Sequence, residues 1–112
     1  MRLKSVLMVC AVLVVATAAA AAQTPVDASA AEALAKKSGC LKCHSVTQKK
    51  VGPPYKETAA KYAGKPDAEQ TLLKHLTTNP KVKIDGKEEE HDSLKTKNEA
   101  DARNVVRWIL SR

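Results

Sequence analysis

The chain has 112 residues, the length of a single domain, and only 3% of them are aromatic. Two tyrosines, one tryptophan and no phenylalanine are a small supply of large side chains for an independent core, so we expect a flat cofactor to fill the interior. The net charge of +7 suits an acidic partner protein, but no basic and aromatic residues interleave, and nucleic acid is therefore not expected as a ligand.

The first 22 residues have the pattern of a secretory signal peptide. A basic start is followed by the apolar run 6–15 and then by an alanine tract. The run is shorter than the about 20 residues of a membrane span, although a retained membrane anchor is the alternative interpretation. We therefore expect a signal peptide at 1–22 and one domain at 23–112, located in the periplasm, with no membrane span after cleavage.

Helix formers, apolar stripes and end signals predict four helices in the remaining chain, at 28–38, at 55–63, at 68–78 and from residue 98 or 101 to the C-terminus. Asp67 is expected to cap the third helix. Val105, Trp108 and Ile109 are spaced to face the core from the last one. The polar stretch 81–97 has no clear period and is expected to be a long loop.

One short motif carries the chemistry, Cys40-Leu41-Lys42-Cys43-His44. A C-x-x-C-H sequence is the attachment motif of haem c. Its two thiols, three residues apart, can add to the two vinyl groups at one haem edge, and the following histidine can then bind the iron as an axial ligand. We therefore predict one covalent haem c, held by Cys40 and Cys43, with His44 as the proximal iron ligand.

Three other sites could use the same residues. A zinc site needs two further ligands, and the sequence has no second cysteine pair. A thioredoxin-like dithiol belongs to a βαβ pattern, which this chain lacks. A structural disulfide between Cys40 and Cys43 is compatible with an oxidising compartment but leaves His44 without a role. Haem attachment explains all three residues.

Several segments around the motif resemble the small bacterial class I cytochromes c, the short monohaem periplasmic type. These segments are Gly39 before the motif, Val51 to Lys56 after it, Ala59 to Gly64 in the second helix, and Val106 to Ser111 at the end. The resemblance implies an all-α class I cytochrome c fold, with short helices wrapped around the haem. It also implies that the first and last helices cross near Gly39, where the lack of a side chain allows close approach. The carbonyl of Pro53 is implied to accept a hydrogen bond from the second ring nitrogen of His44.

The distal ligand departs from that family. Its members place a methionine in the loop before the last helix, but the only methionines here are Met1 and Met8. His91 lies about where that methionine would be, and it is the best candidate for the distal iron ligand. An open or water-bound site and a loop lysine such as Lys83 or Lys87 remain alternatives. By resemblance His75 lies near a haem propionate, although a simple surface histidine is an equal alternative.

These features predict a monohaem electron carrier with two histidine ligands and a lowered reduction potential, and not an enzyme. A haem-based binder or sensor of small ligands, with an open distal site, is the alternative function. We expect redox partner proteins with acidic docking faces, which would meet a rim formed by Lys42, Lys49 and Lys50. The protein is expected to be a monomer.

Overall fold

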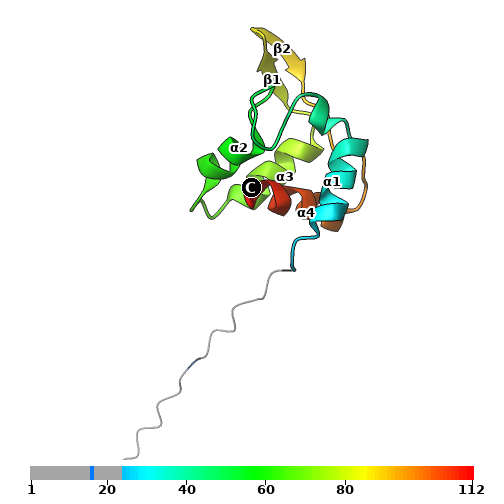
Figure 1. Cartoon of the computed structure of the whole chain (residues 1–112). Helices are drawn as coiled ribbons and strands as arrows, with labels where there is room; N and C mark the ends of the chain where they lie inside the picture. Colours follow the sequence, from blue (N-terminus) through cyan, green and yellow to red (C-terminus); the bar gives the residue numbers. More distant parts are fainter. Residues whose placement is uncertain (1–15, 17–23) are drawn as a thin grey trace, which may run out of the picture.

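The computed structural model describes residue 16 and residues 24–112 (Figure 1). The signal peptide expected at 1–22 therefore lies outside the described residues, apart from Ala16. The elements are, in chain order, α1 (Ala28–Lys37), the 3-10 turn η1 (Cys40–Lys42), α2 (Tyr55–Tyr62), α3 (Ala68–Thr77), β1 (Lys81–Ile84), β2 (Lys87–Glu90) and α4 (Glu99–Leu110). Within 24–112, every helix is too short or too polar to cross a bilayer.

The C-terminal helix α4 is the centre of the fold, and α1, α2 and α3 each pack against it (Figure 1). Its inward face is buried as predicted, with Val105 at 1%, Trp108 at 3% and Ile109 at 4% exposure. Two alanines of α1, Ala31 and Ala35, have no exposed surface at all. The four predicted helices are thus confirmed, and their ends agree to within a residue or two.

The close approach of the first and last helices does not depend on Gly39, contrary to the expectation from the resemblance. A Cβ built on Gly39 would meet only the side chain of Lys42, at an ordinary contact distance of 3.9 Å. The small residues that allow α1 to lie close to α4 are Ala31 and Ala35. Gly39 is needed for a different reason, because its φ of +79° turns the chain from α1 into η1.

An ion-pair cluster joins α3 to α4. The carboxylate of Glu69 accepts a hydrogen bond from Arg107 Nε at 3.1 Å and another from Arg103 Nη1 at 3.0 Å. These bonds, from Arg107 first and Arg103 second, hold the pKa of Glu69 below its ordinary value. The cluster therefore fixes the position of α3 on the central helix at neutral pH.

The stretch 81–97 is not the continuous loop that its composition predicted. Residues 81–90 form an antiparallel hairpin, which rises from the helical body at the top of Figure 1. Its turn residues Asp85 and Gly86 have φ of +50° and +79°, and positive φ at both positions is what a type I′ turn requires. Lysines of β1 lie opposite glutamates of β2, in the pairs Lys81↔Glu90 and Lys83↔Glu88. Opposite charges across the strands therefore stabilise the hairpin.

Candidate haem site

The Cys40–His44 motif begins in a tight turn after α1. The left-handed Gly39 starts η1, and the backbone N–H of His44 donates to the carbonyl of Cys40 at 3.0 Å. Cys40 is half-buried, and burial raises the pKa of its thiol, whereas Cys43 is exposed. The turn therefore presents one thiol toward the interior and one toward the surface, and His44 follows directly.

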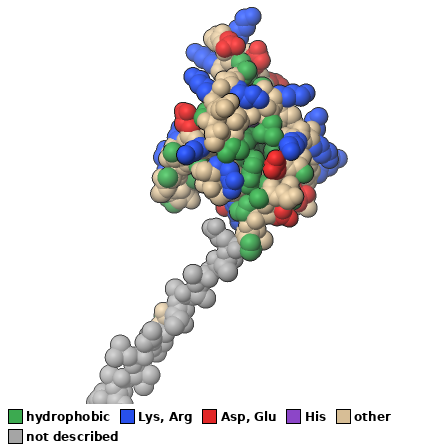
Figure 2. Space-filling model, in the orientation of Figure 1, with side chains coloured by type: hydrophobic (Ala, Val, Ile, Leu, Met, Phe, Trp, Pro, Cys, Tyr) green, Lys and Arg blue, Asp and Glu red, His purple; other side chains and the backbone are tan. Residues whose placement is uncertain are grey.

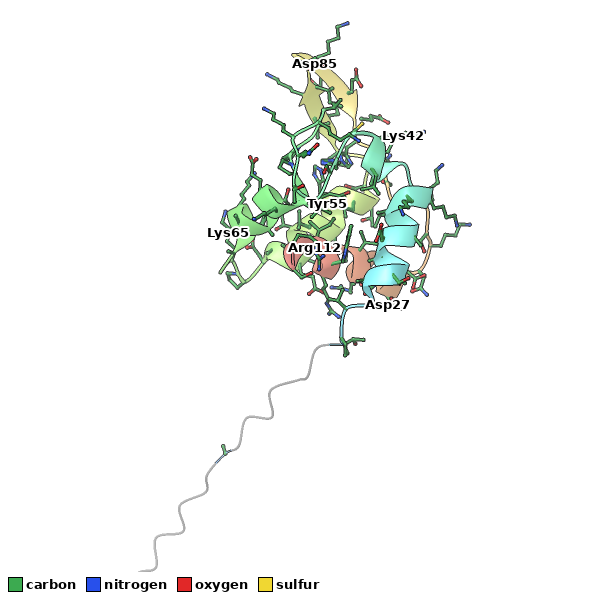
Figure 3. All side chains as sticks on the ribbon, in the orientation of Figure 1. Asp27, Lys42, Tyr55, Lys65, Asp85 and Arg112 are labelled. Carbon is green, nitrogen blue, oxygen red and sulfur yellow. The ribbon has the colours of Figure 1, made fainter. Side chains whose placement is uncertain are left out.

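Two contacts orient the ring of His44. Its Nδ1 lies 2.7 Å from the carbonyl oxygen of Pro53, the contact implied by the family resemblance. Its face stacks on Tyr55, with ring centroids 5.3 Å apart and planes 20° apart. Tyr55 is 5% exposed at the centre of the molecule (Figure 3), and it packs edge-on against Trp108 at 5.5 Å. The hydrogen bond to Pro53 leaves Nε2 of His44 free to bind a metal ion.

The loop from Cys43 to Tyr55 closes tightly over His44. The N–H of Gly52 donates to the carbonyl of Cys43 at 2.8 Å, and the N–H of Tyr55 donates to the carbonyl of Ser45 at 2.9 Å. A Cβ on Gly52 would clash with His44, since it would lie 2.7 Å from Nδ1 and 2.8 Å from Nε2. Glycine is therefore the residue that lets this backbone lie against the imidazole.

Replacing Gly52 with alanine is expected to displace the His44 ring, because two backbone hydrogen bonds hold the loop in place. We expect severalfold less holoprotein and a shifted visible spectrum, measured by absorption of the purified protein per mole of chain. The matched control is Gly64→Ala, because a Cβ there meets nothing within 4 Å and adds only the strain of a positive φ. Equal yields and identical spectra of both variants would show that Gly52 has no role in placing His44.

The hairpin positions His91, which directly follows β2. The N–H of His91 donates to the carbonyl of Pro80 at 2.8 Å, so Pro80 and His91 extend the strand pairing by one position. The side-chain amide of Asn79 donates from Nδ2 to the carbonyl of His91 at 3.2 Å. The backbone of His91 is thus held from both sides at the base of the hairpin. Because side chains alternate along strands, its imidazole lies on the hairpin face that also carries Val82 and Ile84.

The rings of His44 and His91 lie 6.1 Å apart, with an angle of 50° between their planes. Metal–imidazole bonds of about 2 Å on opposite sides of one ion would place ring centroids roughly 6 Å apart. In addition, the buried Nδ1 of His91 has no hydrogen-bond partner within the described part of the chain, so no such bond holds this imidazole away from a metal ion. The two histidines therefore fit a haem iron bound between them.

Burial favours the neutral imidazole that metal binding requires. It lowers the pKa of His91, the backbone of Asp92 partly opposes this, and the nearby His44 adds a smaller lowering. Burial likewise lowers the pKa of His75. At neutral pH both side chains therefore have a free nitrogen lone pair.

His75 of α3 is the third histidine of this cluster, and sequence reasoning did not place it there. Its ring lies 4.6 Å from that of His91, tilted by 52°. It is half-buried, so it is not a simple surface histidine. The propionate contact stays a prediction, because what the structure shows is the packing of His75 against His91. No sequence signal marks this contact, which arises only when α3 and the hairpin base come together.

Comparison with known proteins identifies the family of this chain. The cytochrome c family model matches residues 28–112. Cytochrome c-552 of Hydrogenobacter thermophilus is 39% identical over 83 residues, which are 71% of this chain and 79% of that protein. Cytochrome c-551 of Azotobacter vinelandii is 35% identical over 83 residues, 71% of this chain and 94% of that protein.

The solved structures give the same result. The class 1 cytochrome MtoD from Sideroxydans lithotrophicus ES-1 superposes with a TM-score of 0.75 at 47% identity, covering 78% of this chain and 97% of that one. Wild-type cytochrome c552 of Nitrosomonas europaea superposes with a TM-score of 0.57 at 35% identity, covering 71% and 96%. The chain therefore belongs to the class I branch of the cytochrome c family, and it is a monohaem electron carrier with one covalently attached haem c.

Proposed function

We propose that this cytochrome is a one-electron carrier of lowered potential whose haem iron is bound by two histidines. Cys40 and Cys43 form the thioether bonds, His44 is the proximal ligand and His91 is the distal ligand. The observation that carries this proposal is the 6.1 Å separation of the His44 and His91 rings, which is the distance expected for two imidazoles on one iron. Residues 24–112 contain no methionine that could take the distal position.

The residues around the iron determine its potential. The haem supplies the redox chemistry, an iron that alternates between the ferric and ferrous states. A methionine ligand raises the potential of a c-type haem, whereas an imidazole donates more electron density and stabilises the ferric state. The carbonyl of Pro53, which accepts from His44 at 2.7 Å, makes that imidazole a still stronger donor. With both axial positions filled, no site is left for a substrate, and outer-sphere electron transfer is the chemistry that remains.

The surface beside the attachment motif is suited to docking an acidic redox partner. Lys42, Lys49 and Lys50 are exposed, and the Nζ of Lys50 donates to the carbonyl of Leu41 at 2.7 Å. Val51, beside these lysines, is 53% exposed. Lysines and arginines are spread over the visible face of the molecule, with an apolar stripe exposed between them (Figure 2). We therefore propose that this surface, an apolar centre surrounded by lysines, docks one acidic partner protein at a time. The cytochrome is proposed to act as a monomer.

The cellular compartment is inferred from the Cys40–His44 motif together with the N-terminal signal-peptide pattern. A basic start, an apolar run and an alanine tract are typical of a signal peptide that is removed on export. Export places the protein in the periplasm and leaves a mature chain that begins near residue 23.

The attachment and export steps can be tested by intact-mass analysis. Protein produced in a host that matures haem c is expected to lack residues 1–22 and to carry the mass of one haem. Cys43→Ala is expected to lose most of the holoprotein, because one thioether then remains. Lys42→Ala, at the exposed position between the two cysteines, is the matched control and should mature normally. An apoprotein mass, or a disulfide between Cys40 and Cys43, would refute the proposed attachment.

A further inference from the structure

Five aromatic and imidazole rings form a continuous row through the site. Trp108 contacts Tyr55, Tyr55 stacks on His44, His44 faces His91, and His91 contacts His75. Each of the two proposed ligands therefore has a further ring packed against it. Tyr55 does this for His44, and His75 does it for His91.

The two ligand histidines differ in what fixes their rotation. Nδ1 of His44 is held by the carbonyl of Pro53 at 2.7 Å. Nδ1 of His91 is buried and makes no hydrogen bond of good geometry within residues 24–112, although the backbone of Asp92 lies close to the ring. A ligand imidazole without such a bond can rotate about its bond to the metal unless packing prevents it. The ring of His75, 4.6 Å away and inclined by 52°, is the aromatic group that packs against it.

Both partners of this contact are anchored through their backbones. His75 lies in the last turns of α3, and the carbonyl of its neighbour Leu76 accepts the N–H of Leu94 at 2.9 Å. That bond ties the segment after His91 directly to the helix that carries His75. Rotation of the His91 ring would therefore require it to move against a ring whose backbone is held in place.

From these contacts we infer that His75 is a positioning residue, which packs against the imidazole of His91 and fixes the angle between the planes of the two iron ligands. The inference rests on the proposed ligation by His91. The angle matters because each imidazole donates electron density into the iron d orbital that extends perpendicular to the plane of that imidazole ring. The relative orientation of the two rings therefore sets the splitting of the d orbitals of a low-spin ferric iron.

Electron paramagnetic resonance of the ferric holoprotein measures this splitting directly. We expect His75→Ala to shift and broaden the low-spin g values, because the His91 ring is then free to rotate. His75→Phe keeps a ring at this position and is expected to restore the wild-type spectrum without any ring nitrogen. Lys74→Ala changes the exposed neighbour on the same helix and should have no effect.

Cyanide binding gives a second readout, because His91 must leave the iron before cyanide can bind. Loss of an aromatic contact is expected to make this reaction about threefold to tenfold faster in His75→Ala, and His75→Phe should react at the wild-type rate. If His75→Ala yields no holoprotein, His75→Leu fills the space without a planar ring and is expected to shift the g values in the same way.

The two possible failures are distinct. A low-spin wild type whose g values and cyanide rate are unchanged in His75→Ala and His75→Leu would overturn the role of His75 alone. A high-spin wild type, or a His91→Ala variant with an unchanged low-spin spectrum, would overturn the ligation by His91 and the role of His75 with it.

Discussion

Replacing His91 with alanine is expected to convert the haem iron from six-coordinate low-spin to high-spin or water-bound. His91 lies 6.1 Å from the ring of His44, and no methionine occurs in residues 24–112 to take its place. The vacated position should then bind carbon monoxide in the ferrous state and cyanide in the ferric state. Absorption spectra of the purified holoprotein, recorded in both redox states, measure these changes.

His75 requires a control in this experiment, since its ring lies 4.6 Å from that of His91 and could move toward the iron. The double variant His75→Phe/His91→Ala excludes that substitution, because it leaves His44 as the only imidazole of the site. We expect the double variant to be high-spin even if the single variant retains some low-spin character. A low-spin spectrum that survives in the double variant would show that neither histidine is the distal ligand.

His91→Met should raise the reduction potential, because a thioether donates less electron density than an imidazole. Axial ligands span roughly 0.8 V across haem proteins, so a shift on the order of 0.1 V is expected from this exchange. The hairpin holds the backbone at position 91 through Pro80 and Asn79, which gives the new side chain a fixed starting point. Potentiometric titration measures the shift, and a low-spin variant with an unchanged or lower potential would contradict the ligand assignment.

Folding of the domain is expected to depend on the haem. Among the described residues, the only aromatic side chains of the buried core are Tyr55 and Trp108, five of its members are alanines, and a domain of about 90 residues buries little apolar area. The proposed ligation puts the haem between His44 and His91, so both side chains lose a packing partner when the cofactor is absent. The apoprotein should therefore show weak helical circular dichroism and no cooperative thermal transition.

The double variant Cys40→Ala/Cys43→Ala gives the apoprotein without the complication of a disulfide. Circular dichroism during heating, with the wild-type holoprotein as the reference, measures the difference. The holoprotein is expected to unfold in one cooperative transition. A cooperative thermal transition of the apoprotein, at any temperature, would show that the chain folds without haem.

The sequence predicts the helical part of this fold because the relevant signals are local. Val105, Trp108 and Ile109 recur at helical spacing and are all buried on α4. Asn98 begins that helix as expected, and its side chain accepts from the N–H of Ala100 at 2.9 Å. Asp67 stands at the N-cap of α3 as predicted, but its side chain makes no capping bond to the backbone.

The hairpin was missed although its signals are present in the sequence. Asp85-Gly86 is one of the strongest short signals for a two-residue β-turn. Lysines before it and glutamates after it are spaced to face each other across two strands, as Lys83 and Glu88 do. Charge and low hydrophobicity suggested a loop because the strands bury almost nothing against the helices. Lys81 to Ile84 do alternate between charged and apolar residues, but four residues are a short signal, and β2 has no apolar residue to match them.

The haem site also has a part that local sequence predicts and a part that it does not. The Cys40–His44 motif and Pro53 are close in sequence, so their arrangement follows from a short loop. The contacts of His91 depend on register, because the hairpin pairing places it opposite Pro80. The contact between His75 and His91 depends on how α3 meets the base of the hairpin. Tertiary packing alone determines that contact, and no property of either residue in the sequence predicts it.

Electron paramagnetic resonance of the wild-type ferric holoprotein, combined with absorption spectra in both redox states, tests the central claim most directly. Ligation by His44 and His91 predicts a low-spin spectrum in both states, with g values typical of two imidazole ligands and no absorption band of a methionine–iron bond. A high-spin ferric spectrum that changes on addition of cyanide within seconds would contradict the account and would identify an open, ligand-binding haem instead.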